Sequence, residues 1–245
     1  MKKTFILFLA LIALLDLNAQ EDKIRFGAKA GLNISNISGS EIEFIEFIGD
    51  VNNNYNSIVG FHIGGLVEVP ITEKFAIQPE LLFSTQGYET AIDYTFENSF
   101  FGISQNIVSK GISKVNYLNI PLMLKFYPKN GLSLQAGPQI GFPLSATEKL
   151  LSTTVNGEDA SEFLDDEAFD ESDAIDQYNA IDFGLNLGLG YQLELGLFFD
   201  LRYNIGLSNM IDISGFSEEE LELSGIEDGF KISNRVLQLS VGYKF

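Results

Sequence analysis

The stretch Val-Leu-Gln-Leu-Ser-Val-Gly-Tyr-Lys-Phe, residues 236–245, ends the chain and decides the fold. Leu237, Leu239, Val241 and Tyr243 alternate with polar or small residues, so a strand formed here has one apolar and one polar face. Apolar residues facing outwards, polar residues facing inwards and a terminal aromatic, here Phe245, are typical of the closing strand of a membrane β-barrel. The stretch therefore predicts that the chain inserts into a membrane as strands.

The same alternation recurs in seven earlier segments. Apart from the N-terminus, no stretch approaches the roughly 18 apolar residues of a membrane helix, so any insertion must use strands. Strands of roughly 9–11 residues cross the hydrocarbon when they are tilted. The expected strands are residues 24–34, 59–69, 74–84, 118–126, 132–142, 182–191, 194–204 and 236–245. Pro121 lies inside one of them, where we expect a β-bulge to accommodate it.

The connections between these strands alternate in length. Short turns are expected at 70–73, 127–131 and 192–193, and long polar loops at 35–57, 87–113, 143–178 and 206–234. In outer-membrane barrels the short turns face the periplasm and the long loops face outside. In lipid every strand must pair on both sides, so the sheet must close. We therefore predict an all-β fold, an eight-stranded antiparallel up-and-down transmembrane β-barrel with four long extracellular loops and short periplasmic turns.

The N-terminus has the pattern of a secretory signal. Lys2 and Lys3 precede an apolar run over residues 5–15, and Leu17 and Ala19 occupy the positions that a signal peptidase reads. We expect a signal peptide at residues 1–19, cleavage after Ala19, and one outer-membrane β-barrel domain at residues 20–245.

The charge of the chain is strongly negative and unevenly distributed. The net charge is −19, and 25 of the 34 carboxylates fall in the four predicted long loops. This acidity argues against nucleic acid as a partner, because nucleic acid needs a basic face. The chain has no cysteine, so disulfides and thiolate chemistry are excluded, and no motif in it predicts a cofactor.

The inward faces of the predicted strands carry charges of both signs in nearly equal number. Eight strands leave an interior about wide enough for side chains to fill, so these charges must pair or meet trapped water. Inward glycines such as Gly184, Gly188 and Gly190 leave room for longer side chains. The predicted network comprises Arg25, Lys29, Glu68, Glu80, Lys125, Asp182, Glu194, Asp200, Arg202 and Lys244, with Lys74 as a further inward cation.

Several segments resemble one known family. Residues 117–125, Tyr-Leu-Asn-Ile-Pro-Leu-Met-Leu-Lys, resemble the Tyr-Leu-x-Ile-Pro-Leu-x-Lys strand of the PorT-like outer-membrane β-barrel family, and the glycine patterns at 27–33, 183–190 and 202–209 are similar to that family too. The resemblance covers the whole predicted mature chain. It implies an eight-stranded, porin-family barrel of a Bacteroidota-type outer membrane. One namesake member is tied to protein secretion, whereas most members have no assigned activity.

The segment from Glu158 to Asp176 is the most acidic part of the chain, with ten carboxylates. Carboxylates bind divalent cations such as calcium through hard oxygens, and the weak candidates here are Asp165, Asp166, Asp170 and Asp173. The alternation and glycine of an EF-hand loop are missing, so a solvated acidic loop without a metal is the alternative. Phe163 and Phe169 interrupt the acidic run, which predicts a short helix or a docking contact.

His62, the one histidine, is the only candidate for a catalytic base, and it lies on an inward face. A base needs a nucleophile and an orienting group within reach, and inward serines at 84, 133 and 240 leave an outer-membrane hydrolase open. A hydrogen-bonded structural histidine is the plainer interpretation. A narrow passive porin channel and a soluble lipocalin-like binder are further alternatives.

The sequence favours a non-catalytic outer-membrane protein with a structural, adhesive or partner-binding role through its acidic loops. Such a protein would contact outer-membrane lipid and lipopolysaccharide, and its loops would bind a protein partner. The strand ending at Phe245 would engage the barrel-assembly machinery.

Overall fold

The protein was analysed as a computed structural model, which describes residues 24–39, 51–98, 103–214 and 231–245. The predicted signal peptide at 1–19 lies outside the described residues. Within the described ranges, no helix is both long enough and apolar enough to cross a membrane.

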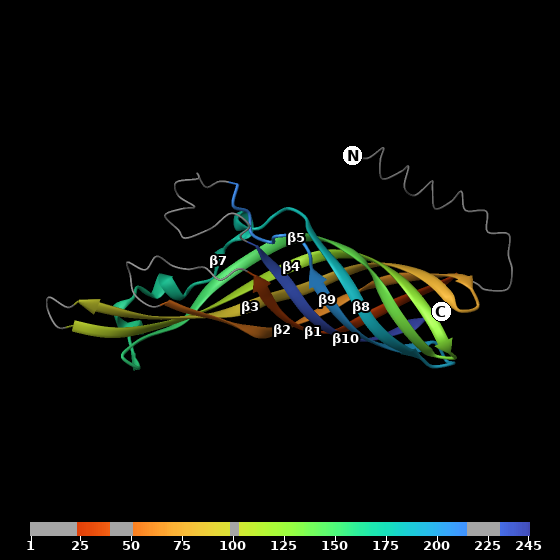
Figure 1. The fold of residues 1–245 in the computed structure, drawn as a ribbon, viewed down its shortest axis with the longest axis horizontal. Helices are drawn as coiled ribbons and strands as arrows, with labels where there is room; N and C mark the ends of the chain where they lie inside the picture. The colour runs from red at the N-terminus through yellow and green to blue at the C-terminus, as the bar shows by residue number, and fades with distance from the viewer. Residues whose placement is uncertain (1–23, 40–50, 99–102, 215–230) are drawn as a thin grey trace.

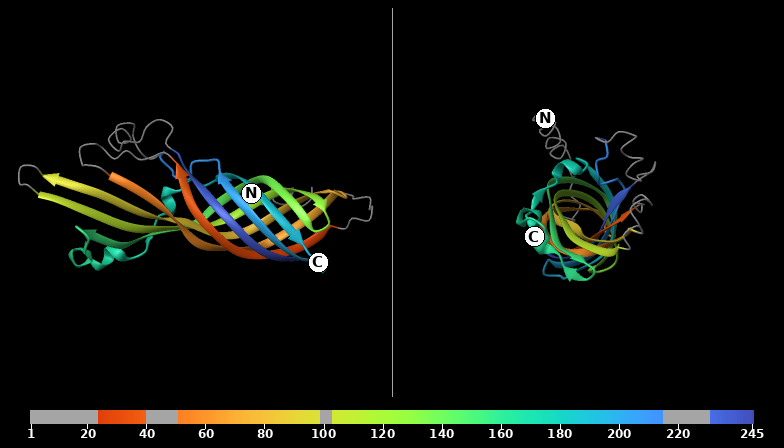
Figure 2. Two further views of the ribbon diagram at one scale, coloured as in Figure 1. Left: turned by 60° about the horizontal axis from the view of Figure 1, so that its bottom comes forward. Right: turned by 90° about the vertical axis from the view of Figure 1, so that its left-hand side faces the viewer.

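Eight long antiparallel strands form a closed ring, as the sequence predicts (Figure 1). Each long strand pairs with the next along the chain, and β1 pairs with β10 to close the ring. The right-hand view of Figure 2 shows this ring from one end. The strands are β1 (Arg25–Gly39), β2 (Val51–Thr72), β3 (Phe75–Asn98), β4 (Ile103–Lys129), β5 (Leu132–Val155), β8 (Asp182–Gln192), β9 (Leu197–Gly206) and β10 (Ile232–Lys244).

Short elements lie in the connection between β5 and β8. Two short strands, β6 (Glu158–Asp159) and β7 (Ser172–Asp173), pair with the edge of β5. Three 3-10 helices are η1 (Ser161–Phe163), η2 (Asp166–Phe169) and η3 (Ile175–Gln177). Both described ends of the chain meet at the end of the barrel that carries the short turns, where the Phe245 amide donates to the Phe26 carbonyl at 2.9 Å. We call this the turn end, and the opposite end the loop end.

The side chains alternate between two environments, and the polarity is that of a membrane barrel. On β1, Phe26 and Leu32 are more than half exposed, whereas Lys29 and Asn33 between them are buried. On β10, Leu239 is exposed while its neighbours Gln238 and Ser240 are buried. Outward apolar residues would meet water at a high cost if the surroundings were aqueous, so this surface requires lipid.

Aromatic residues gather at both edges of the outward apolar band. At the turn end, the Phe75 and Phe126 rings lie 5.0 Å apart and the Tyr243 and Phe245 rings 6.4 Å apart. At the other edge the Phe61 and Phe83 rings lie 5.9 Å apart. Such belts mark the levels of the two lipid headgroup layers.

The strands β2 to β5 extend well past the ring, which corrects the predicted loops. Residues 87–113, predicted as a loop, are mostly strand, because β3 and β4 stay paired as far as Asn98 and Ile103. The predicted loop 143–178 likewise begins with β5, which runs to Val155. The long strands project from the ring in the left-hand view of Figure 2. Above the lipid both faces of a sheet meet water, so the polar alternation disappears although backbone pairing continues.

Pro121 causes no register shift, so the predicted bulge is wrong. Pro121 lies opposite Gln139 on β5 in the same register as the pairs on either side, Ile120 with Ile140 and Leu124 with Ala136. The shifts of β4 against β5 lie elsewhere, beginning at Lys110, Asn116 and Phe126.

Candidate functional site

A buried ion cluster spans the middle of the barrel interior. Glu80 on β3 accepts two hydrogen bonds from Arg202 on β9, at 2.9 and 2.7 Å, and forms an ion pair with Lys29 of β1 at 2.7 Å. Arg202 also donates to Asp200 at 3.1 Å and to Gln135 of β5 at 3.0 Å. These strands are not neighbours in the ring, so the cluster ties opposite walls together. We call it the central cluster.

A second buried cluster closes the turn end. Glu68 of β2 accepts from Lys244 of β10 at 2.5 Å and from the Tyr127 hydroxyl at 2.6 Å, and Lys125 lies 3.8 Å away. Arg25 approaches the other oxygen of Glu68 at 3.4 Å, from a side chain that is 44% exposed. Because Glu68 is fully buried, five groups from β1, β2, β4 and β10 surround a charge that water does not reach.

Gln78 joins the two clusters, and Phe198 lines them. Gln78 donates to Glu80 at 2.6 Å and accepts from Lys125 at 3.3 Å. The Phe198 ring lies under the ammonium groups of Lys244 and Lys125, at 5.0 and 5.8 Å from its centroid. Phe198 is buried on a face where the sequence gave no reason to expect an aromatic residue.

Two residues of the predicted network lie elsewhere. Glu194 lies in the turn between β8 and β9, and Lys74 in the turn between β2 and β3, and both side chains are exposed. They border a hollow of about 510 Å³ at the turn end, together with Arg25 and Tyr127. The assignment of Glu194 and Lys74 to the interior is therefore wrong, because each strand begins after them. One residue of each sign is removed, so the interior charge stays nearly balanced.

Asp182 is interior but separate from both clusters. It accepts from Ser208 at 2.5 Å and from Asn234 at 2.8 Å, near the loop end. Asn234 also donates to the Tyr117 hydroxyl at 3.0 Å. None of the ion pairs between described residues includes Asp182.

The interior around the clusters is filled by side chains. A methyl group added at Gly190 would come within 2.3 Å of Gln135, 2.4 Å of Asp200 and 2.6 Å of Ser133. One added at Gly242 would come within 2.3 Å of the Phe198 ring. Glycine at these positions is what makes room for the long polar side chains, as the sequence predicts for Gly190.

His62 has the partners of a catalytic triad without access to a substrate. Its Nε2 lies 2.8 Å from the Ser240 hydroxyl and its Nδ1 lies 2.8 Å from Oδ1 of Asn33. His62 and Asn33 are fully buried and Ser240 is 6% exposed. A methyl group added at Gly31 would come within 2.7 Å of the imidazole ring, so the site is packed. This arrangement supports a structural histidine, since a substrate carbonyl has no space beside Ser240.

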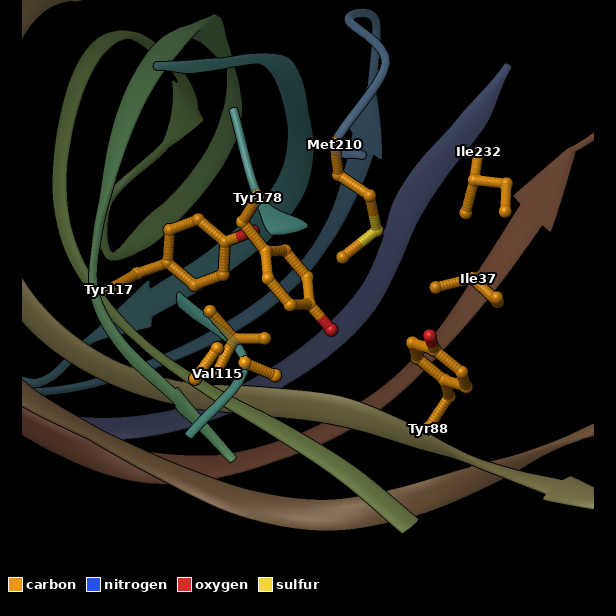
Figure 3. Close-up of a cluster of buried hydrophobic side chains, with 9 residues drawn as sticks. Ile37, Tyr88, Val115, Tyr117, Tyr178, Met210 and Ile232 are labelled. Atoms are coloured by element: carbon orange, nitrogen blue, oxygen red, sulfur yellow. The ribbon is translucent and has the colours of Figure 1, made fainter. Parts of the chain in front are cut away.

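An apolar layer covers the interior at the loop end (Figure 3). It combines residues of the barrel strands with residues of the connections, so we call it the apolar lid. Tyr178 and Met210 come from two different connections, which an isolated bridge between Tyr178 and Ile211 holds together. Burial raises the pKa of the Tyr178 hydroxyl far above its usual range, so it stays neutral. The lid consists of Ile37, Tyr88, Val115, Tyr117, Ala146, Ala174, Tyr178, Met210 and Ile232.

The acidic segment stands beside the lid, at the outer edge of β5. Its predicted metal candidates do not form a site: over the described ranges, no group of three acidic or histidine side chains is placed to hold a metal. Asp165, Asp170 and Asp173 are exposed, and the side chain of Asp166 lies outside the described part. The amide and hydroxyl of Ser161 donate to Asp159 and lower the pKa of its carboxyl. Phe163 is 88% exposed at the end of η1.

The family model for the outer membrane protein beta-barrel domain matches residues 18–212 of the chain. The chain belongs to this family. It is therefore an integral outer-membrane β-barrel protein, and the rule for such barrels makes its turn end periplasmic and its loop end extracellular.

Three solved structures are similar to this barrel in fold. Ail, the attachment invasion locus protein of Yersinia pestis in complex with the heparin analogue sucrose octasulfate, is 12% identical, with 91% of this chain and 100% of that chain covered and a TM-score of 0.44. Neisserial surface protein A is 12% identical, with 91% and 100% covered and a TM-score of 0.42. OprG of Pseudomonas aeruginosa is 13% identical, with 90% and 95% covered and a TM-score of 0.38. A comparison with curated proteins finds no match.

Proposed function

We propose that this barrel is a closed, non-catalytic anchor that holds a partner-binding surface outside the cell. The proposed contact is the acidic segment from Glu158 to Asp176, supported by the projecting strands β2 to β5. The partner would be a protein with a basic rim around an apolar pocket, because charge complementarity directs association and a buried aromatic supplies binding energy.

Phe163 is the observation that carries this proposal. Its side chain is 88% exposed, although nine other large apolar side chains of the same end are gathered into or against the lid. Glu162 and Asp165 beside it are exposed as well. An isolated exposed phenylalanine gains nothing in water, whereas an aromatic ringed by polar groups is typical of the centre of a protein interface.

Photo-crosslinking in living cells tests the proposed contact. A photoreactive phenylalanine analogue replaces Phe163, and the matched control places it at Leu151, which is 44% exposed near the end of β5. We expect one discrete protein adduct from position 163, lost when Glu162→Gln and Asp165→Asn are added. The same adducts from both positions, or none from position 163, would refute the proposal.

Planar-bilayer conductance tests whether the barrel is closed. The packed central cluster and the cluster around Glu68 support a barrel without an open water path, so we expect no steady single-channel current. A steady open-pore conductance would favour the alternative of a narrow passive porin.

The finer family and the export route are also proposals. We infer a PorT-like protein of a Bacteroidota-type outer membrane from the motif at 117–125, and cleavage after Ala19 from the leader pattern. The outward aromatic at Phe245, next to the closing strand β10, suits recognition by the barrel-assembly machinery. N-terminal sequencing of the protein from outer membranes tests the cleavage site.

A further inference from the structure

Three exposed lysines stand together on the outer face of β4 and β5. Lys110 and Lys114 lie on β4, and Lys149 on β5 faces Ile112, the residue midway between them. The neighbour Ser113 is buried on the inner face, which fixes Lys114 to the outer one. Residues opposite or diagonal on one sheet face lie roughly 5–8 Å apart, so the three ammonium groups can reach one anion. We call this set the lysine triangle.

The lysine triangle lies just above the outward apolar band. Thr85, Asn116 and Ser145 form a hydrogen-bonded row across β3, β4 and β5, at 2.8 and 3.0 Å, where the apolar residues end. Lys114 is two residues above Asn116 on the same face. At roughly 3.3 Å per residue and a tilt of about 40°, two residues rise ~5 Å. A lysine there reaches the lipid headgroup layer, which its stem allows it to approach along the apolar surface.

The charge of this patch opposes that of the whole chain. Residues 103–155 contain five lysines and one glutamate, although the chain carries a net charge of −19. None of the ion pairs formed by the described residues includes Lys110, Lys114 or Lys149. Glu89, opposite Ile112 on β3, is bound instead by Asn56 at 3.5 Å. Like charges side by side are destabilising, so an anion from outside would relieve them.

We propose that the lysine triangle binds the phosphate groups of a phosphorylated glycolipid in the outer leaflet. The patch faces the surrounding lipid at headgroup level, and lysine binds phosphate as a point charge. The acidic segment repels such headgroups, so the barrel would take up anionic lipid on the side of β4 and β5. This surface is separate from the proposed protein contact at Phe163.

Lipid binding by the full-length protein in detergent tests this assignment. The probe is diphosphorylated lipid A titrated against the protein and measured by native mass spectrometry. The test variant is Lys114→Gln with Lys149→Gln. Since each lysine near an anionic surface contributes a factor of roughly five in affinity, we expect binding about 25-fold weaker.

Two controls make the outcome decisive. Lys74→Gln with Lys129→Gln removes the same charge from exposed turn-end positions and should leave the affinity within about twofold. Dephosphorylated lipid A should bind the unaltered protein as weakly as lipid A binds the test variant. Equal affinities for the two double variants, or equal binding of both lipids, would overturn the proposal. So would binding of soluble polyglutamate in place of lipid A, because the patch would then serve an acidic protein.

Discussion

The two halves of the barrel interior are filled in opposite ways. Towards the periplasm, charges such as Glu80, Arg202 and Glu68 form buried ion clusters. Towards the outside, tyrosines and aliphatic side chains form the apolar lid. The charged half is built from strand residues and their adjoining turns, whereas the lid takes Tyr178 and Met210 from two connections.

This difference separates two tasks. Ion clusters that link strands across the ring hold the barrel closed, because each charge would be left unpaired in a dry interior if the wall moved. The lid instead fixes the connections onto the barrel mouth, since its apolar residues are buried only when both connections are in place. We therefore expect substitutions in the charged half to affect the whole barrel, and substitutions in the lid to affect the connections alone.

Glu80→Ala should have the largest effect, because it leaves Arg202 and Lys29 without their shared carboxylate. Removing one partner of a buried ion pair costs roughly 3–5 kcal/mol. We expect a lower urea midpoint for unfolding in lipid vesicles and a lower temperature for the gel-mobility shift. Glu73→Gln, at an exposed turn residue, is the control and should change stability by less than about 0.5 kcal/mol. Equal midpoints for the two variants would contradict the structural role of the central cluster.

Met210→Ala should loosen the lid and leave the ring intact. Met210 is 1% exposed, and truncating a buried methionine costs about 2–5 kcal/mol. Because the lid is local, we expect faster cleavage of the segment 158–176 by a glutamate-specific protease added from outside, with an unchanged gel-mobility shift. Leu151→Ala, at a 44% exposed position, is the matched control. A variant whose whole barrel melts earlier would show that lid and ring are one unit.

Gly190→Ala tests the packing of the charged half. The new methyl group would press on Gln135 and Asp200, and overpacking of this kind costs roughly 1–3 kcal/mol. Gly65→Ala is the matched control, because its nearest neighbour would lie 3.8 Å away and the position is exposed. Urea titrations of the two variants should therefore differ. If both alanines were tolerated, the interior would contain more free space than the distances at Gly190 indicate.

Phe163→Ala should have the smallest effect on stability and the largest on binding. An exposed side chain contributes little to folding, so we expect a change within about 0.5 kcal/mol. Binding of the crosslinked partner should fall strongly, measured as loss of the adduct when the analogue is moved to position 162. An unchanged adduct would place the contact elsewhere on the projecting sheet.

The sequence was sufficient for the membrane-spanning part of the fold. Each strand crosses from lipid to a polar interior with every second residue, so the pattern at Leu237, Leu239 and Val241 records the two environments directly. The same parity identified Glu80, Arg202 and Lys29 as inward residues. Their mutual distances depend on the stagger of the closed ring, which no single strand reveals.

Outside the lipid the sequence was less informative. Strands β3 and β4 continue past Tyr88 with water on both sides, and polarity then no longer distinguishes strand from loop. Tyr178 and Met210 come together only through the folding of two connections, so their lid could not be foreseen from either segment. The inward Phe198 breaks the polar pattern because two lysines lie over its ring.

The pairing of β1 with β10 has a consequence for biogenesis. Gly27 lies opposite Lys244, with nearly all of the described chain between them. The first hairpins can form early from local contacts, but the seam is sealed only after the last strand has been delivered. Until that moment the intermediate exposes two ragged borders of unmet amide and carbonyl groups to any passing strand. A protein built in this way is therefore most vulnerable to mispairing in the final instant of its maturation.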